Sequence, residues 1–461
     1  MSEAVATSQQ GLVGKYKPYP EYKDSGVEWL GEIPSEWQKM PLKRYCSVVS
    51  GYAFPSEMFI DSGLPVVRIG DIKSDGSVVL DDCKYIEEQN SHLYSRFAIS
   101  PGELLMAMTG ATIGKAGWFK SDTKAFLNQR VGSFRVSDCF EYKFLWYVLN
   151  SSGYQEYIQL TAFGGAQPNI SDTGMLAYET AYPTINEQRA IAAFLDYETA
   201  RIDRLIAQQQ RLIELLKEKR QAVISHAVTK GLNPDAPMKD SGVEWLGQVP
   251  EHWNVTKFGF ISNVVRGGSP RPAGDPELFD GDYSPWVTVA EITKDEEVYL
   301  ESTESFLTEK GSKQSRVFKR GTLLLSNSGA TLGVPKILSI DANANDGVVG
   351  FEKLSVNTEY AYFYLSTLTD NLRERIKQGS GQPNLNTDIV KSIVIPLPPS
   401  GEVEAILSEI KTHRITFSVL ISKADTAIKL MQERRTALIS AAVTGKIDLR
   451  GWTPPAEEAA A

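Results

Sequence analysis

Two long stretches of the chain carry an apolar stripe with alternating spacings of four and three residues. The first stretch, residues 187–228, contains neither Gly nor Pro. Its stripe consists of Ile191, Leu195, Glu198, Ile202, Leu205, Gln209, Leu212, Leu216, Lys219 and Val223. A mean period of 3.5 residues keeps one seam of a helix against a partner helix, which is the condition for a coiled coil. The pattern therefore predicts a helix of roughly 60 Å, because each residue adds ~1.5 Å.

The second stretch repeats this spacing near the C-terminus. Its stripe consists of Val403, Ile406, Ile410, His413, Phe417, Leu420, Ala424, Ala427, Met431, Arg434 and Leu438. Gly231 and Gly445 stand where helix-ending residues are expected. Two unrelated helices, each packed on its own domain, are the alternative. We favour an antiparallel coiled coil, which relates the two halves of the chain by a pseudo-twofold axis.

The remaining chain has the pattern of short strands and turns. Residues 40–184 and 255–396 carry short apolar runs, such as LPVVRIG and SIVIPLP, that are interrupted by Gly, Pro, Asn and Asp. This alternation predicts an α+β protein with two mixed α/β domains separated by the two long helices.

Five sequence blocks occur twice in the same order. DSGVEWLGEIPSEW (24–37) returns as DSGVEWLGQVPEHW (240–253), with ten of fourteen letters identical. The other pairs are GELLMAMTGATIGK (102–115) with GTLLLSNSGATLGV (321–334), LNQRVGSF (127–134) with ANDGVVGF (344–351), AQPNIS (166–171) with GQPNLN (381–386), and KEKRQAVISHAVTKG (217–231) with QERRTALISAAVTGK (432–446). Between the blocks the halves diverge, which indicates one duplicated scaffold that displays two different surfaces.

The repeat and the helix patterns together predict the domain boundaries. The expected order is an N-terminal tail (1–23), a first globular domain (24–184), a first helix (185–232), a linker (233–239), a second globular domain (240–396), a second helix (397–447) and a C-terminal tail (448–461).

Composition narrows the class of protein. The net charge of −9 argues against a broad coating of nucleic acid, so any nucleic-acid site has to be local. No apolar run approaches the ~20 residues that span a bilayer, and the first residues lack the features of a secretory signal. Three cysteines, Cys46, Cys83 and Cys139, form neither a disulfide framework nor a metal pair. We therefore expect a cytoplasmic protein without a metal site.

Common catalytic motifs are missing. GATIGKA, residues 110–116, resembles a phosphate-binding loop, but its glycines are one residue too close together and Ala116 replaces the required Ser or Thr. The second copy, GATLGVP, lacks the lysine. We interpret both copies as turns between strands. The sequence also contains no dinucleotide fingerprint, no G-x-S-x-G and no H-E-x-x-H, which favours a binding module over an enzyme.

The ordered and duplicated blocks, from Asp24 to Leu449, resemble the specificity subunit of type I restriction–modification systems. The resemblance implies that each half is a target recognition domain followed by a spacer helix, and that each domain reads one half of a bipartite site in double-stranded DNA. It implies that the helices set the spacer and dock partner subunits, and that this chain has no catalysis and no cofactor of its own. Two modification subunits carrying S-adenosylmethionine would methylate adenine, and two restriction subunits using ATP and Mg would translocate and cut DNA.

Candidate DNA contacts follow from basic and small polar residues on the predicted loops. In the first domain they are Arg68, Lys73, Arg96, Thr109, Thr112, Lys115 and Arg130. In the second domain they are Arg266, Arg271, Lys310, Lys313, Arg316, Lys319, Arg320, Ser326, Asn327 and Thr331. The run from 310 to 320 could equally be an ordinary solvated loop. The second copy lacks the counterparts of Lys115 and Arg130, so it has to contact DNA with other residues.

Two Gln-Pro-Asn segments present an open choice. Gln167 and Asn169, like Gln382 and Asn384, have side chains that can bind adenine edges. They can also stabilise a turn around the proline, and we favour this structural role because both diverged halves keep them.

A second class of function also fits the repeat. A two-headed scaffold could bind two identical partner proteins without touching DNA. The divergence between the blocks argues against it, because heads that bind identical partners have less reason to differ.

Overall fold

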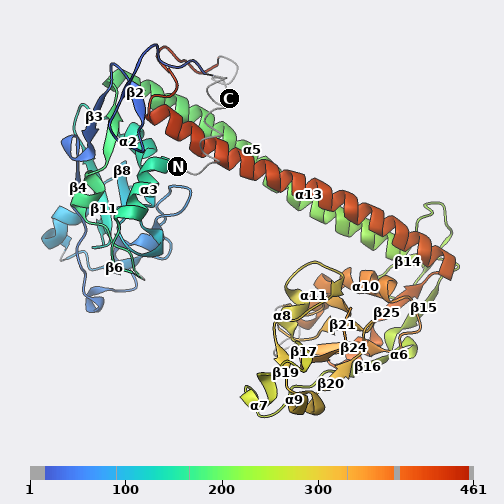
Figure 1. The fold of residues 1–461 in the computed structure, drawn as a ribbon. Helices are drawn as coiled ribbons and strands as arrows, with labels where there is room; N and C mark the ends of the chain where they lie inside the picture. Colours follow the sequence, from blue (N-terminus) through green and yellow to red (C-terminus); the bar gives the residue numbers. More distant parts are fainter. Residues whose placement is uncertain (1–15, 90, 166, 330, 378–384, 456–461) are drawn as a thin grey trace. The chain divides into compact units, whose positions relative to one another are not determined.

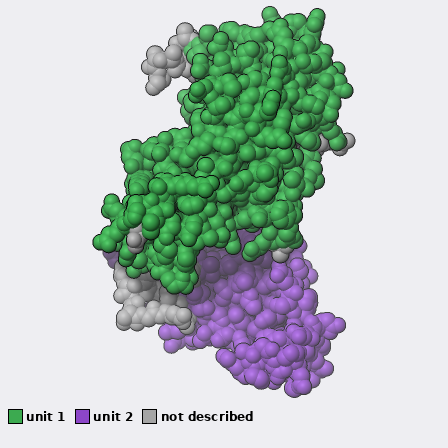
Figure 2. Space-filling model, turned by 90° about the vertical axis from the view of Figure 1, so that its left-hand side faces the viewer, with its two compact units in different colours: residues 1–210, 425–461 green, residues 211–424 purple. Residues whose placement is uncertain are grey.

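The computed structural model describes residues 16–455 except 90, 166, 330 and 378–384. The chain folds into two compact units (Figure 2). The long helices contribute to both, because the boundaries at 210 and 424 fall within them. Unit 1 comprises residues 1–210 and 425–461, and unit 2 comprises residues 211–424. The end of the chain therefore belongs to the same unit as its beginning.

Unit 1 contains two four-stranded sheets and two strand pairs (Figure 1). The strand order of the first sheet is β6 (Lys84–Ile86), β5 (Leu64–Val67), β10 (Ala125–Leu127), β7 (Ala98–Ile99). The strand order of the second sheet is β4 (Cys46–Ser50), β11 (Val131–Val136), β8 (Glu103–Ala107), β9 (Ala116–Phe119). The pairs are β1 (Tyr22–Asp24) with β2 (Glu32–Pro34), and β3 (Gln38–Pro41) with β12 (Glu179–Tyr182). The helices are α2 (Tyr142–Leu149), α3 (Ser152–Thr161), α4 (Asp172–Leu176) and α5 (Ile185–Lys230), with short 3₁₀ turns at η1 (Leu42–Arg44), η2 (Ser56–Met58), η3 (Ile69–Asp71), η4 (Ser91–Phe97) and η5 (Gly110–Thr112).

Unit 2 repeats this plan with local changes. Its five-stranded sheet has the order β16 (Asn263–Arg266), β24 (Val348–Glu352), β21 (Leu323–Ser326), β22 (Pro335–Leu338), β18 (Tyr299–Leu300). Its four-stranded sheet has the order β19 (Phe306–Leu307), β17 (Ser284–Val287), β23 (Ala342–Ala344), β20 (Arg316–Phe318). The strand pairs are β13 (Met238–Asp240) with β14 (Gln248–Pro250), and β15 (Asn254–Lys257) with β25 (Val394–Leu397). The helices are α6 (Phe258–Ile261), α7 (Pro276–Phe279), α8 (Val289–Thr293), α9 (Glu309–Gln314), α10 (Thr358–Ser366), α11 (Thr369–Lys377), α12 (Thr387–Ser392) and α13 (Ser400–Val443). The predicted α+β class and the two long helices are confirmed.

Each core joins a sheet to the helices. In unit 1, Leu104 and Phe134 of one sheet pack in the same cluster as Phe144 of α2, Tyr154 of α3 and Leu438 of α13. In unit 2, the buried Tyr360 of α10 donates its hydroxyl hydrogen bond to the carbonyls of Val228 (2.9 Å) and Pro396 (2.8 Å). The long helices are therefore integral to both cores and are not separate from the domains.

The two long helices run antiparallel within each unit (Figure 1). In unit 1, Arg435 of α13 pairs with Asp203 of α5 at 3.0 Å, and Ile191 of α5 shares a cluster with Val443 of α13. In unit 2, Ile224 and Val228 of α5 share a cluster with Ile406, Leu407 and Ile410 of α13. The pairing predicted from the stripes is confirmed.

Most predicted seam positions face inward, including Gln209, Leu216 and Val223 of α5. The four exceptions, which are exposed, are Leu205, Leu212, Lys219 and Leu420. Leu205, Leu212 and Leu420 are exposed to 43%, 42% and 42%. The neighbouring Ile206, Ile213 and Ile421 are half-buried instead. The inward positions Glu198, Ile202 and Ile206 make two successive steps of four. Because a straight α-helix has 3.6 residues per turn, a strict 3.5-residue pattern drifts across its surface. In α5 the extra step of four moves every second inward position by one residue, to Ile206 and Ile213, and leaves Gln209 and Leu216 in place.

Each copy of the repeated opening block connects the start of one long helix to the end of the other. Trp37 donates its indole N–H to Glu187 at the start of α5 (3.1 Å), and Trp253 donates to Glu402 at the start of α13 (2.9 Å). Gly231 and Gly445 follow the helices with φ of 77° and 73°, as expected for helix-ending glycines.

Parts of the two predicted tails are packed in unit 1. Tyr19 is buried, and the backbone N–H of Asp448 donates to the carbonyl of Lys17 (2.7 Å). The Trp452 ring lies edge-on to Phe194 of α5, with 5.3 Å between ring centroids. The predicted boundaries at 23 and 448 thus separate residues that pack together.

Candidate nucleic-acid interface

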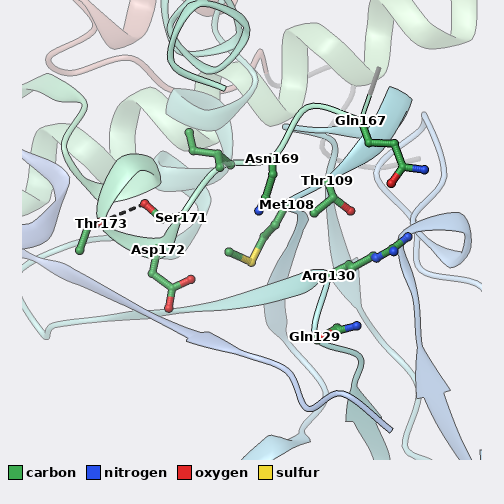
Figure 3. A pocket seen from close by; sticks show the side chains of 10 residues that line it. Met108, Thr109, Gln129, Arg130, Gln167, Asn169, Ser171, Asp172 and Thr173 are labelled. Atoms are coloured by element: carbon green, nitrogen blue, oxygen red, sulfur yellow. Dashed lines mark hydrogen bonds between the residues drawn. The ribbon is translucent and has the colours of Figure 1, made fainter. Parts of the chain in front are cut away.

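A polar hollow of about 680 Å³ opens among the loops of unit 1 (Figure 3). Three segments of the repeated blocks build it: the residues after β8, the turn between β10 and β11, and the chain leading into α4. It is lined by Met108, Thr109, Gln129, Arg130, Gln167, Asn169, Ile170, Ser171, Asp172 and Thr173. The repeated blocks, which are far apart in the sequence, therefore meet at one surface.

Backbone hydrogen bonds hold the Gln-Pro-Asn segment in place. Asn169 exchanges backbone hydrogen bonds with Phe163 (2.7 and 3.0 Å), and the Gly110 N–H donates to the Pro168 carbonyl (2.8 Å). Ser171 then caps α4, because its side chain accepts the N–H of Gly174 (3.1 Å). These contacts fix the backbone of the segment, whereas the structural role that we predicted concerns the Gln167 and Asn169 side chains and stays a prediction. Both side chains line the hollow.

The hollow has two chemically different sides. Arg130 and Gln167 are exposed, and their polar ends extend to the same side (Figure 3). Asp172 lies on the opposite side, where it accepts a hydrogen bond from the Ser50 hydroxyl. No hydrogen bond or ion pair of the Arg130 guanidinium is found within the described residues. Five N–H donors of this group therefore remain available to a ligand.

The other candidates of the first domain have mixed environments. Thr109 and Thr112 have buried hydroxyls without a hydrogen-bond partner in the described chain. Lys115 reaches the Ser74 hydroxyl at 3.5 Å, and Lys73 donates to the Gly70 carbonyl at 3.0 Å.

Arg68 and Arg96 do not line the hollow. Arg68 donates to the Asp82 carbonyl (2.8 Å) and lies 3.8 Å from the buried Asp71 carboxylate, so it stabilises a turn. Arg96 is exposed on η4. Thr109 and Arg130 are therefore the two predicted residues that the structure brings together at the hollow.

The basic run from 310 to 320 in unit 2 is largely neutralised by acidic neighbours. Its ion pairs are Lys310 with Glu277 (2.5 Å), Lys313 with Glu309 (2.7 Å), Arg316 with Glu352 (3.1 Å) and Lys319 with Asp341 (2.7 Å). The bond from Lys319 lowers the pKa of the Asp341 carboxyl, whose other oxygen accepts the backbone N–H of Arg320. The run is not a loop, because it forms α9 and β20, but its charges are solvated and paired as in the alternative that we considered.

The remaining candidates of unit 2 divide into buried and exposed groups. Ser326 is buried and donates to the Thr331 carbonyl (2.7 Å), while the Thr331 side chain is exposed. Asn327 is fully buried, and neither amide atom has a hydrogen-bond partner among the described residues. Gln382 and Asn384 lie outside the described residues.

A second basic loop of unit 2 surrounds Asp346. Arg266 donates from Nε to the Asp346 carbonyl (2.5 Å), and Ser269 donates to its carboxylate (2.7 Å). The hydrogen bond from Ser269 lowers the pKa of Asp346, burial opposes this shift, and the nearby charges of Arg266 and Arg271 reinforce it. Arg271 is exposed.

Sequence reasoning missed three residues of these loops: Gln129, Asp172 and Asp346. Gln129 and Asp346 occupy the same place in the third repeated block, where the halves read NQR and NDG. This difference within a shared block was the signal that could have identified Gln129 and Asp346 as candidates.

Within the described ranges, no three His, Cys, Asp or Glu side chains form a group that could hold a metal ion. Over the same residues, no helix is long and apolar enough to cross a membrane.

Two copies of one α/β framework with different polar loops, each joined to a long helix, define a duplicated recognition module. The family model for the type I restriction modification DNA specificity domain matches residues 34–215 and 250–424. The chain therefore belongs to the family of type I restriction–modification specificity subunits.

Individual relatives agree with this assignment. The chain is 22% identical to the EcoKI specificity subunit of Escherichia coli K12 over 441 residues, which covers 90% of each chain. It is 26% identical to the MjaVIII specificity subunit of Methanocaldococcus jannaschii over 234 residues, covering 49% of this chain and 54% of that protein. The match to the MjaIX specificity subunit of the same organism is 32% identical and spans 38% of that protein.

Solved structures support the fold. One chain from a study of complex assembly and conformational transition of the type I R-M system has a TM-score of 0.68 at 16% identity, covering 89% of this chain and 98% of that one. The HsdS subunit of Thermoanaerobacter tengcongensis has a TM-score of 0.50 at 16% identity, covering 90% of this chain and 98% of that one.

Proposed function

We propose that this chain is the DNA-reading subunit of a type I restriction–modification complex and that each globular domain reads one half of a bipartite site. The observation that carries the proposal is a constant framework with different loop side chains. The Met108 N–H donates to the Arg130 carbonyl and the Asn327 N–H donates to the Gly347 carbonyl, both at 2.9 Å. The backbone is thus the same at a place where the side chains differ, as two readers of different sequences require.

The charge distribution supports a local DNA contact. The net charge is −9, and many candidate cations are engaged by carboxylates. Exposed guanidinium groups without a side-chain partner in the described chain remain at Arg96, Arg130, Arg271 and Arg320. A few phosphate and base contacts of this kind position a protein on DNA, and larger partners can supply the rest of the phosphate binding.

The outer face of the long helices is the proposed docking surface for modification subunits. In unit 1 its exposed apolar residues are Leu205 and Leu430. In unit 2 they are Leu212, Leu215, Ile415, Val419 and Leu420. A partner that covers these side chains would remove their apolar surface from water, which favours association.

The proposal assigns catalysis to the partners. Two modification subunits would bind S-adenosylmethionine and methylate adenine, and two restriction subunits would use ATP and Mg. This chain would act in the cytoplasm and contribute no cofactor.

The decisive experiment is co-expression with the adjacent modification gene, followed by mapping of methylated adenines across a genome. The expected result is one bipartite motif with an unread spacer. Replacing residues 40–184 by the same region of a relative should change one half of the motif and leave the other half unchanged. A complex that forms but produces no motif would instead support the two-headed protein scaffold.

A further inference from the structure

The loops of the two domains can be matched residue by residue through their backbone hydrogen bonds. The Gly51 N–H donates to the Val131 carbonyl (3.1 Å), and the Gly267 N–H donates to the Val348 carbonyl (2.9 Å). The residues that precede these glycines, Ser50 and Arg266, are therefore equivalent. By the same reasoning Arg130 is equivalent to Gly347, because the carbonyls of both accept the matching N–H groups described above.

A guanidinium occurs at this place in both domains, but it comes from different elements. In the first domain it belongs to Arg130, in the turn between β10 and β11. In the second domain that position is Gly347, where a Cβ would approach Val289 to 2.7 Å and the Ser328 hydroxyl to 3.0 Å. The second domain supplies Arg266 instead, from the end of β16, where the first domain has the short Ser50.

The carboxylate near each guanidinium also comes from non-equivalent positions in the two domains. The Ile170 N–H donates to the Met108 carbonyl (3.0 Å) and the Leu385 N–H to the Asn327 carbonyl (2.7 Å), so these two donors are equivalent. Two residues further along, Asp172 of the first domain corresponds to Thr387 of the second. The second domain has its carboxylate at Asp346, in the position of Gln129. Each domain therefore has a guanidinium and a carboxylate at these loops, but non-equivalent residues carry them.

We infer that Arg130 and Arg266 are the base-reading groups of their domains and that each binds a guanine in its own half-site; this inference rests on the proposed function. The hollow that Arg130 lines also holds the Asp172 carboxylate on its opposite side, and in unit 2 the Asp346 carboxylate lies near Arg266. A ligand for both groups has to offer hydrogen-bond donors as well as acceptors, and a phosphate offers acceptors alone. A base pair suits the combination, since Arg binds O6 and N7 of guanine while Asp accepts from N4 of cytosine.

The surroundings of each arginine agree with this role. Arg130 is exposed, and Gln167 extends to the same side, where its amide can bind an adjacent adenine (Figure 3). Arg266 uses Nε to bind the Asp346 carbonyl, which orients the plane of its guanidinium. No other hydrogen bond of this side chain occurs in the described part of unit 2. Because the two groups start from different strands and turns, the two domains place their guanidinium groups differently on one framework.

The test uses the full chain co-expressed with the modification subunits and compares methylated motifs. Arg130→Ala should relax one guanine position in one half of the motif, and Arg266→Ala should relax one guanine position in the other half. Discrimination at that position should fall on the order of 10- to 100-fold, the value of one good bidentate pair. Arg44→Ala, which removes an exposed arginine that does not line the hollow and is not among the candidate DNA contacts, is the control and should leave both halves unchanged.

A second substitution separates reading from folding. Arg130→Lys keeps the positive charge but removes the bidentate geometry, so it should relax the same guanine while the complex still forms and binds. If both alanine variants methylate the wild-type motif with unchanged discrimination, the inference is overturned and the proposed function stands. If the wild-type complex yields no bipartite motif, the proposed function itself fails.

Discussion

Gly445 lies directly against the indole ring of Trp37. A Cβ on Gly445 would come within 2.9 Å of the Trp37 ring and 2.5 Å of Pro34, and Gly445 has a φ of 73°. In unit 2, Gly231 lies against Trp253 in the same way, with a Cβ distance of 3.2 Å. The opening block occurs twice because each copy receives the end of one long helix. In unit 1 the helix end arrives from the far end of the chain.

We predict that Gly445→Ala destabilises unit 1 by ~2 kcal/mol or more. A left-handed backbone costs an L-residue roughly 1–2 kcal/mol, and the new methyl group also has to displace Pro34. Thermal unfolding followed by circular dichroism measures the effect. Gly401→Ala is the matched control, because its Cβ meets nothing within 4 Å and should stabilise α13 slightly. Equal unfolding temperatures for both variants would contradict the close packing at Gly445.

The corrected seam gives a second prediction. Ile206→Asp should cost about 2 kcal/mol or more, because Ile206 packs against the core of unit 1 and an unpaired charge there is poorly solvated. Leu205→Asp should change the free energy of unfolding by no more than ~0.5 kcal/mol, because Leu205 is 43% exposed. Chemical denaturation measures both, and the reverse order would restore the seam expected from sequence alone.

The ion pair between Arg220 and Glu296 predicts a pH-dependent contribution to the stability of unit 2. The hydrogen bond from Arg220 lowers the pKa of the Glu296 carboxyl, against the opposing effect of burial, and the charges of Lys217 and Arg414 reinforce it. The pKa of Glu296 is thus lower in the folded chain than in the unfolded chain, where it is about 4.3. The ion pair therefore stabilises the fold at pH values above the unfolded pKa, and this stabilisation is lost as the pH falls through the folded pKa.

The measurement compares wild type with Glu296→Gln across pH 3 to 7, values that bracket the ordinary carboxyl pKa of about 4.3. The unfolding temperature of the wild type should exceed that of the variant at neutral pH, and the difference should shrink below about pH 4. Glu297→Gln is the control, because no ion pair of that carboxylate occurs among the described residues. A difference that stays constant with pH would show that charge is not its cause.

The buried amide of Asn327 gives a fourth prediction. Its two amide atoms have no partner in the described chain, and such a group costs about 1–3 kcal/mol. Asn327→Leu, which has the same branched shape, should therefore raise the free energy of unfolding by about 1 kcal/mol. Asn343 is the matched control: it is also fully buried, but its amide bonds to the Ser312 carbonyl (3.1 Å) and hydroxyl (2.8 Å). Asn343→Leu should destabilise, and a loss of stability in both variants would mean that Asn327 is satisfied in solution.

The proposed docking surface gives a fifth prediction. Ile415 is 67% exposed, so Ile415→Asp should leave thermal unfolding of the free chain within ~0.5 kcal/mol of wild type. The same substitution should strongly reduce co-purification of the modification subunit, because a charge would replace an apolar contact. Ser418→Asp, at an exposed polar position of the same helix, is the control. Undiminished co-purification of the Ile415 variant would place the docking surface elsewhere.

The sequence by itself determined the duplication, the two long helices and their glycine ends. These features depend on local rules, because apolar spacing, the absence of Gly and Pro, and the left-handed preference of glycine act over a few residues. The order of the repeated blocks also identified the family.

Only the tertiary structure decided which of two adjacent apolar residues on a helix faces inward, and which basic side chains form no ion pair. Leu205 and Ile206 are both large apolar residues one position apart, and packing against α13 selects Ile206. The lysines of residues 310–320 form a basic run in the sequence, yet partners as distant as Glu277 and Asp341 engage them. Arg130 keeps its guanidinium free because no acidic side chain folds back onto its turn in the described structure. Such outcomes depend on residues far apart in the chain that meet only when it folds, so no local pattern contains them.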